Sequence, residues 1–184
     1  KKLQPAFNTL FVAFFILGLS SSALSQEKKG KRININNADK GIYQKGLGKN
    51  RLLGNVIFEH EGALMYCDSA WLFSEANKIR AFENVYINQG DTIELWGDYL
   101  EYSGNTKIAT VTGKEVRLKD KKMELITDRL KYDRKNNQAY YYTGGEITSD
   151  ENFLVSQQGF YNSKDKLFQF KDSVVLTNPD YVIE

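Results

Sequence analysis

The segment GDYLEYSGNTK (97–107) decides the fold class, because closely similar segments lie on either side of it. CDSAWLFSEANK (67–78) precedes it and TDRLKYDRKNNQ (127–138) follows it, and each ends in a turn rich in Asn and Lys. A period of about 30 residues is typical of stacked repeats, in which each unit covers the apolar face of the next. The aspartates that mark the period are Asp39, Asp68, Asp98 and Asp128.

The runs between these turns have the composition of β-strands. They are rich in Val, Ile, Leu, Tyr and Phe and alternate apolar with polar side chains, as in GNVIF (54–58), ENVYI (83–87) and TIELW (92–96). Turn clusters such as NQGD (88–91) separate them. Pro is rare, as expected where most strands pair on both sides. The sequence therefore predicts an all-β array with four short strands in each unit and no helix beyond the N-terminal segment.

Alternation assigns one side-chain series of each strand to a shared apolar interior. Polar neighbours such as Glu94, Glu101 and Lys131 are then expected on the outside. Small residues at one repeat position, Cys67 and Gly97, predict close packing there. The predicted interior residues are Val56, Phe58, Leu64, Tyr66, Leu72, Val85, Ile87, Ile93, Leu95, Leu100, Tyr102, Val116, Leu118, Met123, Leu125, Leu130, Tyr132 and Phe160.

The N-terminal residues predict export. Lys1 and Lys2 precede the apolar run FNTLFVAFFILGL (7–19) and a small-residue stretch, which is the pattern of a cleaved signal peptide spanning 1–25. The run is too short to cross a hydrocarbon core of ~30 Å comfortably. Residues 26–32 form a basic linker ahead of the repeats. Without the two lysines the formal charge of +2 falls to near zero, so nucleic acid is not expected as a partner.

The aspartate ladder is the most suggestive candidate for a site. Stacked carboxylates can coordinate calcium, but no Gly-Asp-dense calcium repeat flanks these residues, and the next repeat position holds Gln158. Aspartates that bond to local backbone in turns account for the same pattern. We therefore expect an architectural role for the ladder and no metal site.

The remaining candidates for chemistry are weak. His60, the single histidine, lies in EHEG (59–62) and is expected to be a solvated turn residue. No Ser or Cys stands in a recognisable nucleophile motif, so neither catalysis nor a cofactor is expected. Trp71 and Trp96 fall at outward positions, where they either stack on sugars or pack at edges and between units.

The phrases LLGNVIFEHEGALMYCDSAWLF (52–73), FENVYINQGDTIELWGDYLEYS (82–103) and ITDRLKYDRKNN (126–137) resemble the OstA-like domains of lipopolysaccharide transport. The resemblance covers 33–184. It implies a twisted, V-shaped β-jellyroll that is hollow and open at both ends. It also implies that acyl chains of lipopolysaccharide bind inside, and that domains stack end to end as a bridge across the periplasm. No single functional residue of the family carries over, only the inward apolar positions.

The leading hypothesis from the sequence is a non-enzymatic lipopolysaccharide-binding and transport protein of the periplasm, free there or associated with the outer membrane. Its partners would be lipopolysaccharide and either related jellyroll proteins or further copies of itself, joined by strand addition at the ends. One alternative is an exported β-solenoid scaffold that holds no ligand. Another is a carbohydrate-binding or carbohydrate-processing β-helix protein that uses the aspartates and the outward Trp residues.

The C-terminal residues raise a question about the edge of the array. TNPDYVIE (177–184) aligns with INQGDTIEL (87–95) and stops within a strand, with no evident cap. We expect that the domain continues past Glu184; the alternative is that this edge is offered to a partner.

Overall fold

The computed structural model describes residues 31–44, 46 and 48–184. The predicted signal peptide and most of the predicted linker lie outside the described residues. In the described part all regular structure is β, and it forms one antiparallel sheet of 15 strands, so the predicted all-β class is confirmed. The same residues contain no helix long and apolar enough to cross a membrane.

The sheet has long central strands and short terminal ones. The strands from β3 to β8 follow one another as antiparallel neighbours, and β1 and β2 both pair with β3. The bounds are β1 (Asn34–Asn37), β2 (Lys40–Gln44), β3 (Lys49–His60), β4 (Ala63–Phe73), β5 (Lys78–Asn88), β6 (Glu94–Ser103), β7 (Ile108–Lys119), β8 (Met123–Asp133), β9 (Gln138–Tyr141), β10 (Gly145–Ser149), β11 (Asn152–Ser156), β12 (Gln158–Asn162), β13 (Leu167–Lys171), β14 (Val175–Asn178) and β15 (Tyr181–Ile183).

Each long strand bends at its middle, where its pairing register shifts. In the pairing of β5 with β6 the residues between Phe82 and Val85 are left out, and both of them, Glu83 and Asn84, have positive φ (64° and 49°). Such bulges bend a strand and increase its twist without ending it. The recurring GNV and ENV signatures are therefore the sites where the sheet turns a corner.

The bends correct the predicted strand count. TIELW and the following GDYLEYS were expected to form separate strands, but residues Glu94–Ser103 of these two segments form one strand, β6. Each central unit therefore has two long strands instead of four short ones. Alternation fails at a bulge, because two residues oppose one, and the sequence pattern there looks like a strand boundary. After β8 the bends do become breaks, between β9 and β10, β11 and β12, and β13 and β14.

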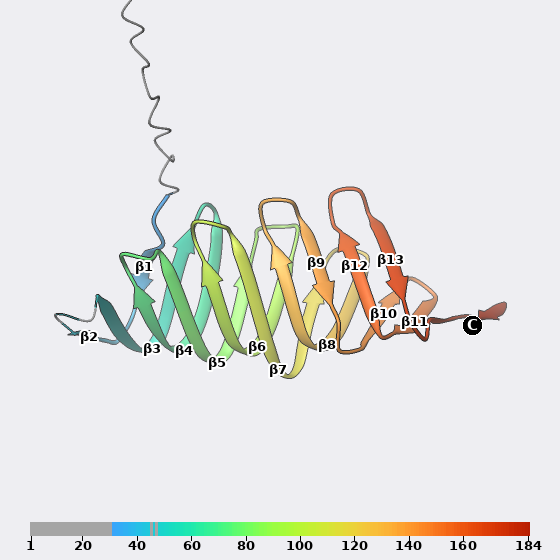
Figure 1. Cartoon of the computed structure of the whole chain (residues 1–184), viewed down its shortest axis with the longest axis horizontal. Coiled ribbons are helices and arrows are strands. Elements are labelled where there is room, and N and C mark those ends of the chain that lie inside the picture. Colours follow the sequence, from blue (N-terminus) through green and yellow to red (C-terminus); the bar gives the residue numbers. More distant parts are fainter. Residues whose placement is uncertain (1–30, 45, 47) are drawn as a thin grey trace, which may run out of the picture.

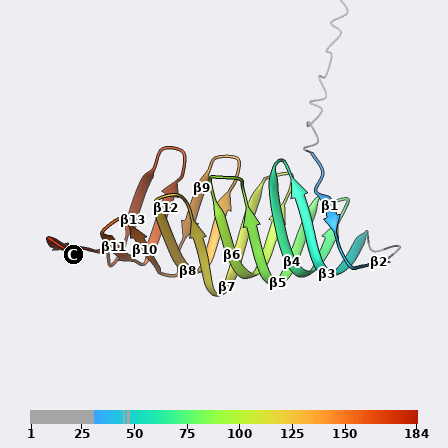
Figure 2. The same ribbon diagram turned by 180° about the vertical axis from the view of Figure 1, so that it is seen from behind.

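The bends fold the sheet into two facing layers. The first layer begins with β1, continues through the halves of β3 to β8 that lie between β1 and β10, and ends with β10, β11, β14 and β15. The second layer holds β2, β9, β12, β13 and the other halves of β3 to β8. The bends join the layers along the lower edge in Figure 1, and the hairpin turns of β3 to β9 lie along the upper edge. The view from behind shows the same arrangement (Figure 2).

Close approach at the bends requires small residues. A Cβ added to Gly97 would overlap the Val111 side chain, and one added to Gly159 would overlap the Tyr141 ring. Cys67 occupies the equivalent position in β4 and is buried. Burial raises the pKa of its thiol to about 11, so it behaves as a small apolar residue. The small-residue position predicted from the repeat is thereby confirmed as a packing feature.

Candidate functional site

The interior between the two layers is continuous and apolar. Leu95 and Leu118 of the first layer and Leu100 and Leu130 of the second are 0% exposed. Most of the predicted interior residues are buried in this one cluster. They are Val56, Phe58, Leu72, Val85, Ile87, Ile93, Leu95, Leu100, Tyr102, Val116, Leu118, Met123, Leu125, Leu130 and Tyr132.

Leu64 and Tyr66 were predicted inside, and that assignment is wrong. The inward residue of β4 between them is Met65, 1% exposed, while Tyr66 is half-buried on the outer face and stacks on Tyr86 with ring centroids 5.5 Å apart. Every residue from Ala63 to Cys67 is apolar or aromatic, so alternation alone does not choose the face. The pairing with β3 sets the register.

Phe160 was also assigned to the wrong face. It packs on Tyr140 on the outside, with ring centroids 5.1 Å apart, and its neighbour Tyr161 is the buried residue. Two adjacent aromatic residues made both registers compatible with the sequence. The pairing of β12 with β9 decides between them, because Tyr161 lies opposite the buried Ala139.

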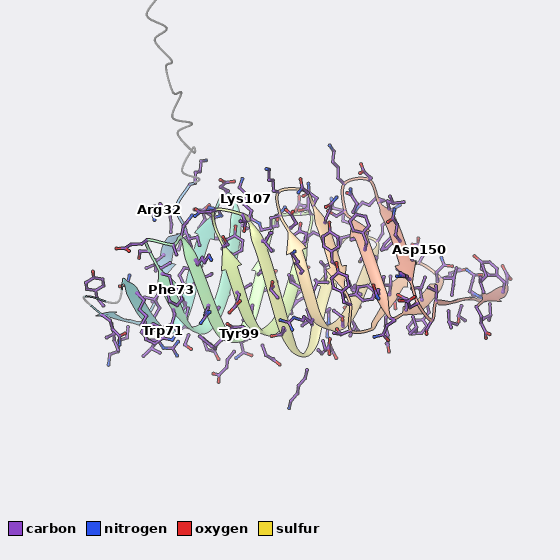
Figure 3. All side chains as sticks on the ribbon, viewed as in Figure 1. Arg32, Trp71, Phe73, Tyr99, Lys107 and Asp150 are labelled. Atoms are coloured by element: carbon purple, nitrogen blue, oxygen red, sulfur yellow. The ribbon has the colours of Figure 1, made fainter. Side chains whose placement is uncertain are left out.

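At the edge opposite the bends, the described hairpin turns of the two layers meet through side-chain contacts and not through strand pairing; we call this edge the seam. Second-layer turns at 74–77, 104–107, 134–137 and 163–166 face first-layer turns that include 61–62 and 120–122. Lys107 and Arg32 both lie near this edge, whereas Trp71 and Tyr99 lie towards the bends (Figure 3).

At the N-terminal end of the seam, Asn77 joins the layers. Its Oδ1 accepts the Ile33 N–H at 3.0 Å, and its Nδ2 donates to the Lys31 carbonyl at 3.0 Å. Asn77 is buried and has positive φ (52°), a conformation that Asn tolerates well. The Asn-rich turn seen in the sequence therefore serves two purposes, since it shapes the hairpin and it fastens the first strand to the second layer.

The central part of the seam contains His60, which the sequence placed in a solvated turn. That prediction is wrong, because His60 is 0% exposed. Its Nε2 lies 2.9 Å from the Lys31 carbonyl, which can only accept, so in the neutral ring Nδ1 accepts from the Tyr102 hydroxyl at 2.6 Å. The same hydroxyl accepts from Arg134 Nη1 at 2.7 Å. The turn folds inward because these polar partners lie beneath it.

An ion pair lies beside this network. Lys107 Nζ contacts the Glu61 carboxylate across the seam, and both side chains are about one-quarter to one-third exposed. The Lys107 hydrogen bond holds the pKa of Glu61 below its usual range. Partial exposure makes this a modest contribution to stability, but its position fixes one layer against the other.

Towards the C-terminal half, Asp120 joins the layers. Its carboxylate accepts from Tyr161 Oη and, at 2.7 Å, from Lys166 Nζ, both of the second layer. It also accepts the Lys122 and Met123 amides at 2.8 and 3.1 Å. Burial alone would raise the pKa of Asp120, but the hydrogen bonds from Lys166, Tyr161 and Lys122 outweigh it and hold that pKa below its usual range.

Three tyrosines at equivalent repeat positions connect the apolar interior to the seam. Tyr102, Tyr132 and Tyr161 are each at most 2% exposed, and their hydroxyls reach His60, Gln89 and Asp120 of the first layer. Burial raises the pKa of all three, that of Tyr132 to about 12. Tyr102 and Tyr132 were predicted as interior residues, but the bonds made by their hydroxyls were missed. The available signal was a Tyr two residues before three of the four second-layer turns; Leu72 holds that position before the turn at 74–77.

The aspartate ladder was predicted to lie in turns, and that prediction is wrong: Asp68, Asp98 and Asp128 lie at the bends within β4, β6 and β8. Asp68 Oδ2 accepts from Asn84 Nδ2 at 2.7 Å, and Asp98 Oδ2 accepts the Lys114 amide at 3.0 Å. Asp39 and Asp128 make equivalent bonds to Asn55 and Thr143. Each carboxylate thus holds the bulge of the next strand. Among the described residues no three His, Cys, Asp or Glu side chains group closely enough to hold a metal ion.

The outward aromatic residues cover one another. Trp96 stacks on Tyr86 at 5.2 Å, with Arg117 over it, and Lys49 Nζ lies 4.3 Å from the Trp71 ring centroid. Stacked rings and cations occupy the faces that a sugar would need. Both Trp residues are on the outer surface, as predicted, in packed rows that run across the strands.

The described residues thus form an all-β jellyroll of repeated strand pairs, with a continuous apolar interior and a polar seam. The chain matches the family of OstA-like proteins over residues 31–184 and is a member of it. No curated protein matches the sequence.

Two solved structures show limited similarity. One is LptH from Pseudomonas aeruginosa, described as the LptA homologous periplasmic component of the conserved lipopolysaccharide transport device; it is 12% identical, with 80% of this chain and 94% of that chain covered and a TM-score of 0.48. The other is the E1021V mutant of the TCP10 domain of Danio rerio CPAP; it is 13% identical, with 79% and 97% covered and a TM-score of 0.15.

Proposed function

We propose that this protein binds lipopolysaccharide in the periplasm, shields its acyl chains between the two layers and helps to deliver it to the outer membrane. The observation that carries the proposal is the continuous apolar interior, whose two walls are joined covalently at the bends and only by side chains at the seam. Membership of the OstA-like family supports the same reading.

Binding of this kind needs neither a catalytic group nor a cofactor. Each methylene moved from water into an apolar interior contributes ~0.8 kcal/mol, so a few acyl chains supply high affinity. The interior residues of this structure already contact one another, so the layers must separate to admit a chain. The bulged bends are suitable hinges, because extra unpaired residues absorb a change of direction.

A ligand-free scaffold is the second candidate, and a specific observation favours it. Phe58, Ile87, Leu95 and Leu118 are all 0% exposed, so the protein's own side chains fill the space between the layers. The carbohydrate alternative has less support, because the outward rings cover one another and the aspartates bind bulges.

Photo-crosslinking in cells distinguishes lipopolysaccharide binding from the ligand-free scaffold. A photoreactive residue at Leu95 or Leu118, on the interior face, is expected to capture lipopolysaccharide. The same residue at Glu94 or Lys119, which pair with each other on the outer face, is expected to capture little. Equal capture from both faces would refute the interior site, and no capture from either would favour the scaffold.

We further propose that residues 1–25 direct export, that 26–32 link the signal to the domain at 33–184, and that the domain joins other copies or related jellyrolls end to end. Among the described residues, β13 pairs with β12 and β15 with β14, each along one side, and Leu167, Tyr181, Val182 and Ile183 are exposed there. An unpaired edge of this kind accepts a further strand through main-chain hydrogen bonds.

Light scattering over a concentration series tests this association. The protein is expected to form elongated species that lengthen as concentration rises. Substitution Val182→Pro removes a backbone donor from β15 and restricts its geometry, so it should suppress the growth. The control is Thr148→Pro in β10, a strand that pairs on both sides, which should destabilise the fold instead. A strict monomer at high concentration would count against self-association.

A further inference from the structure

Arg134 is a buried cation at the centre of the seam. It lies in the second-layer turn after β8 and is 9% exposed. Its Nη1 and Nη2 donate to the carbonyl oxygens of His60 and Glu61 at 3.1 and 3.3 Å. Its Nε donates to Gln89 Oε1 at 2.9 Å, and Nη1 also reaches the Tyr102 hydroxyl.

All of these acceptors are neutral. Within residues 31–44, 46 and 48–184, no carboxylate lies within ion-pairing distance of Arg134, whereas two other seam cations, Lys107 and Lys166, are paired with Glu61 and Asp120. A buried charge is costly unless an opposite charge compensates it. The Arg134 guanidinium is hydrogen-bonded but not neutralised, which is the condition of a site prepared for an anion.

The position of this charge relates it to the interior. The Tyr102 ring, which contacts the guanidinium through its hydroxyl, is part of the apolar cluster between the layers. An amphiphile with its chains in the interior would therefore have its polar head at the seam, next to Arg134. Opening the seam would also remove the first-layer acceptors, the carbonyls of His60 and Glu61 and the Gln89 amide, and leave the planar donor fork available.

We propose that Arg134 binds a phosphate group of the glycolipid head when acyl chains occupy the interior; this rests on the proposed function. Guanidinium and phosphate match in geometry, because two parallel N–H donors meet two oxygens of one anion. The phosphate takes the place of the three neutral acceptors of the first layer and supplies the missing negative charge. The Arg134 side chain thus holds the seam closed in the absence of lipid and binds the headgroup phosphate when lipid is present.

The test compares two ligands and two variants. The ligands are lipid A with its phosphates and the same lipid after phosphatase treatment. Arg134→Met keeps an unbranched apolar stem and removes the charge and all the donors of the guanidinium. The control, Arg129→Met, removes the same charge from an exposed outer-face residue of β8 with no side-chain partner among the described residues. Circular dichroism establishes that each variant is folded before binding is measured.

The unchanged protein should bind phosphorylated lipid about 10- to 100-fold more tightly than dephosphorylated lipid, as expected for charge-assisted hydrogen bonds. Arg134→Met should lose that preference while keeping its affinity for dephosphorylated lipid, and Arg129→Met should keep the preference. Millimolar inorganic phosphate should not displace the lipid; displacement would assign the site to free phosphate and overturn the headgroup assignment.

Other outcomes are equally decisive. Equal affinity of the unchanged protein for both lipids, or an equal loss of both in Arg134→Met, would overturn the assignment of Arg134 and leave the interior site intact. Failure of the unchanged protein to bind either lipid would instead refute the proposed function.

Discussion

Replacing Asp120 by Ala is expected to lower the free energy of unfolding by about 2–4 kcal/mol, because it removes an acceptor that serves four donors of both layers. The carboxylate is 1% exposed, whereas Lys166 is 55% exposed and can return to water. The cost therefore comes mainly from Tyr161, whose buried hydroxyl loses its partner, and from two turn amides. In thermal unfolding followed by circular dichroism, the melting temperature should fall by roughly 5–15 °C.

Asp91→Ala is the matched control, since Asp91 is an exposed aspartate of another first-layer turn. It should leave the melting temperature nearly unchanged, and an equal fall in both variants would remove the special role of Asp120. The pH dependence gives a second measurement. The folded pKa of Asp120 is depressed, so its stabilisation is present above the unfolded value of ~3.9 and is lost as pH falls through the folded pKa. Asp120→Ala should lack that part of the acid destabilisation.

The repeat period was sufficient to predict the all-β array and most of the interior. A strand whose polar and apolar residues alternate cleanly, such as Glu94 between Ile93 and Leu95, has only one register that buries the apolar face. Where adjacent residues are both apolar, as at Leu64 and Met65 or Phe160 and Tyr161, two registers satisfy the pattern. Only pairing with the neighbouring strand distinguishes them.

The seam was not predictable for a different reason. Its bonds join residues far apart in the chain, such as Arg134 with the carbonyl of His60, 74 residues away. The repeat pattern shows that turns recur but not that the turns of the two layers meet, because this depends on the bends. His60 was therefore placed in solvent, although the bulges bring Tyr102 and Arg134 against it.

Linking the two layers covalently across the seam is expected to abolish loading of lipid into the interior. The bends are continuous backbone, so the walls can separate only along the seam, where Glu61 and Lys107 face each other. We would replace both by Cys and join them with a short, cleavable bis-maleimide. Cys67 should not react, because it is buried and its thiol pKa is raised to about 11.

Loading is measured as the fluorescence change of a labelled lipopolysaccharide before cross-linking, after cross-linking and after cleavage of the linker. Binding should be lost in the linked protein and return on cleavage, because the hinge is then free to open. Each single-Cys variant treated with the same reagent controls for loss of the ion pair and for the bulk of the adduct, and both should load normally. Undiminished loading of the linked protein would mean that acyl chains enter lengthwise through the ends of the jellyroll. In that case the seam contacts would be permanent walls of the interior, and the bends would not act as hinges.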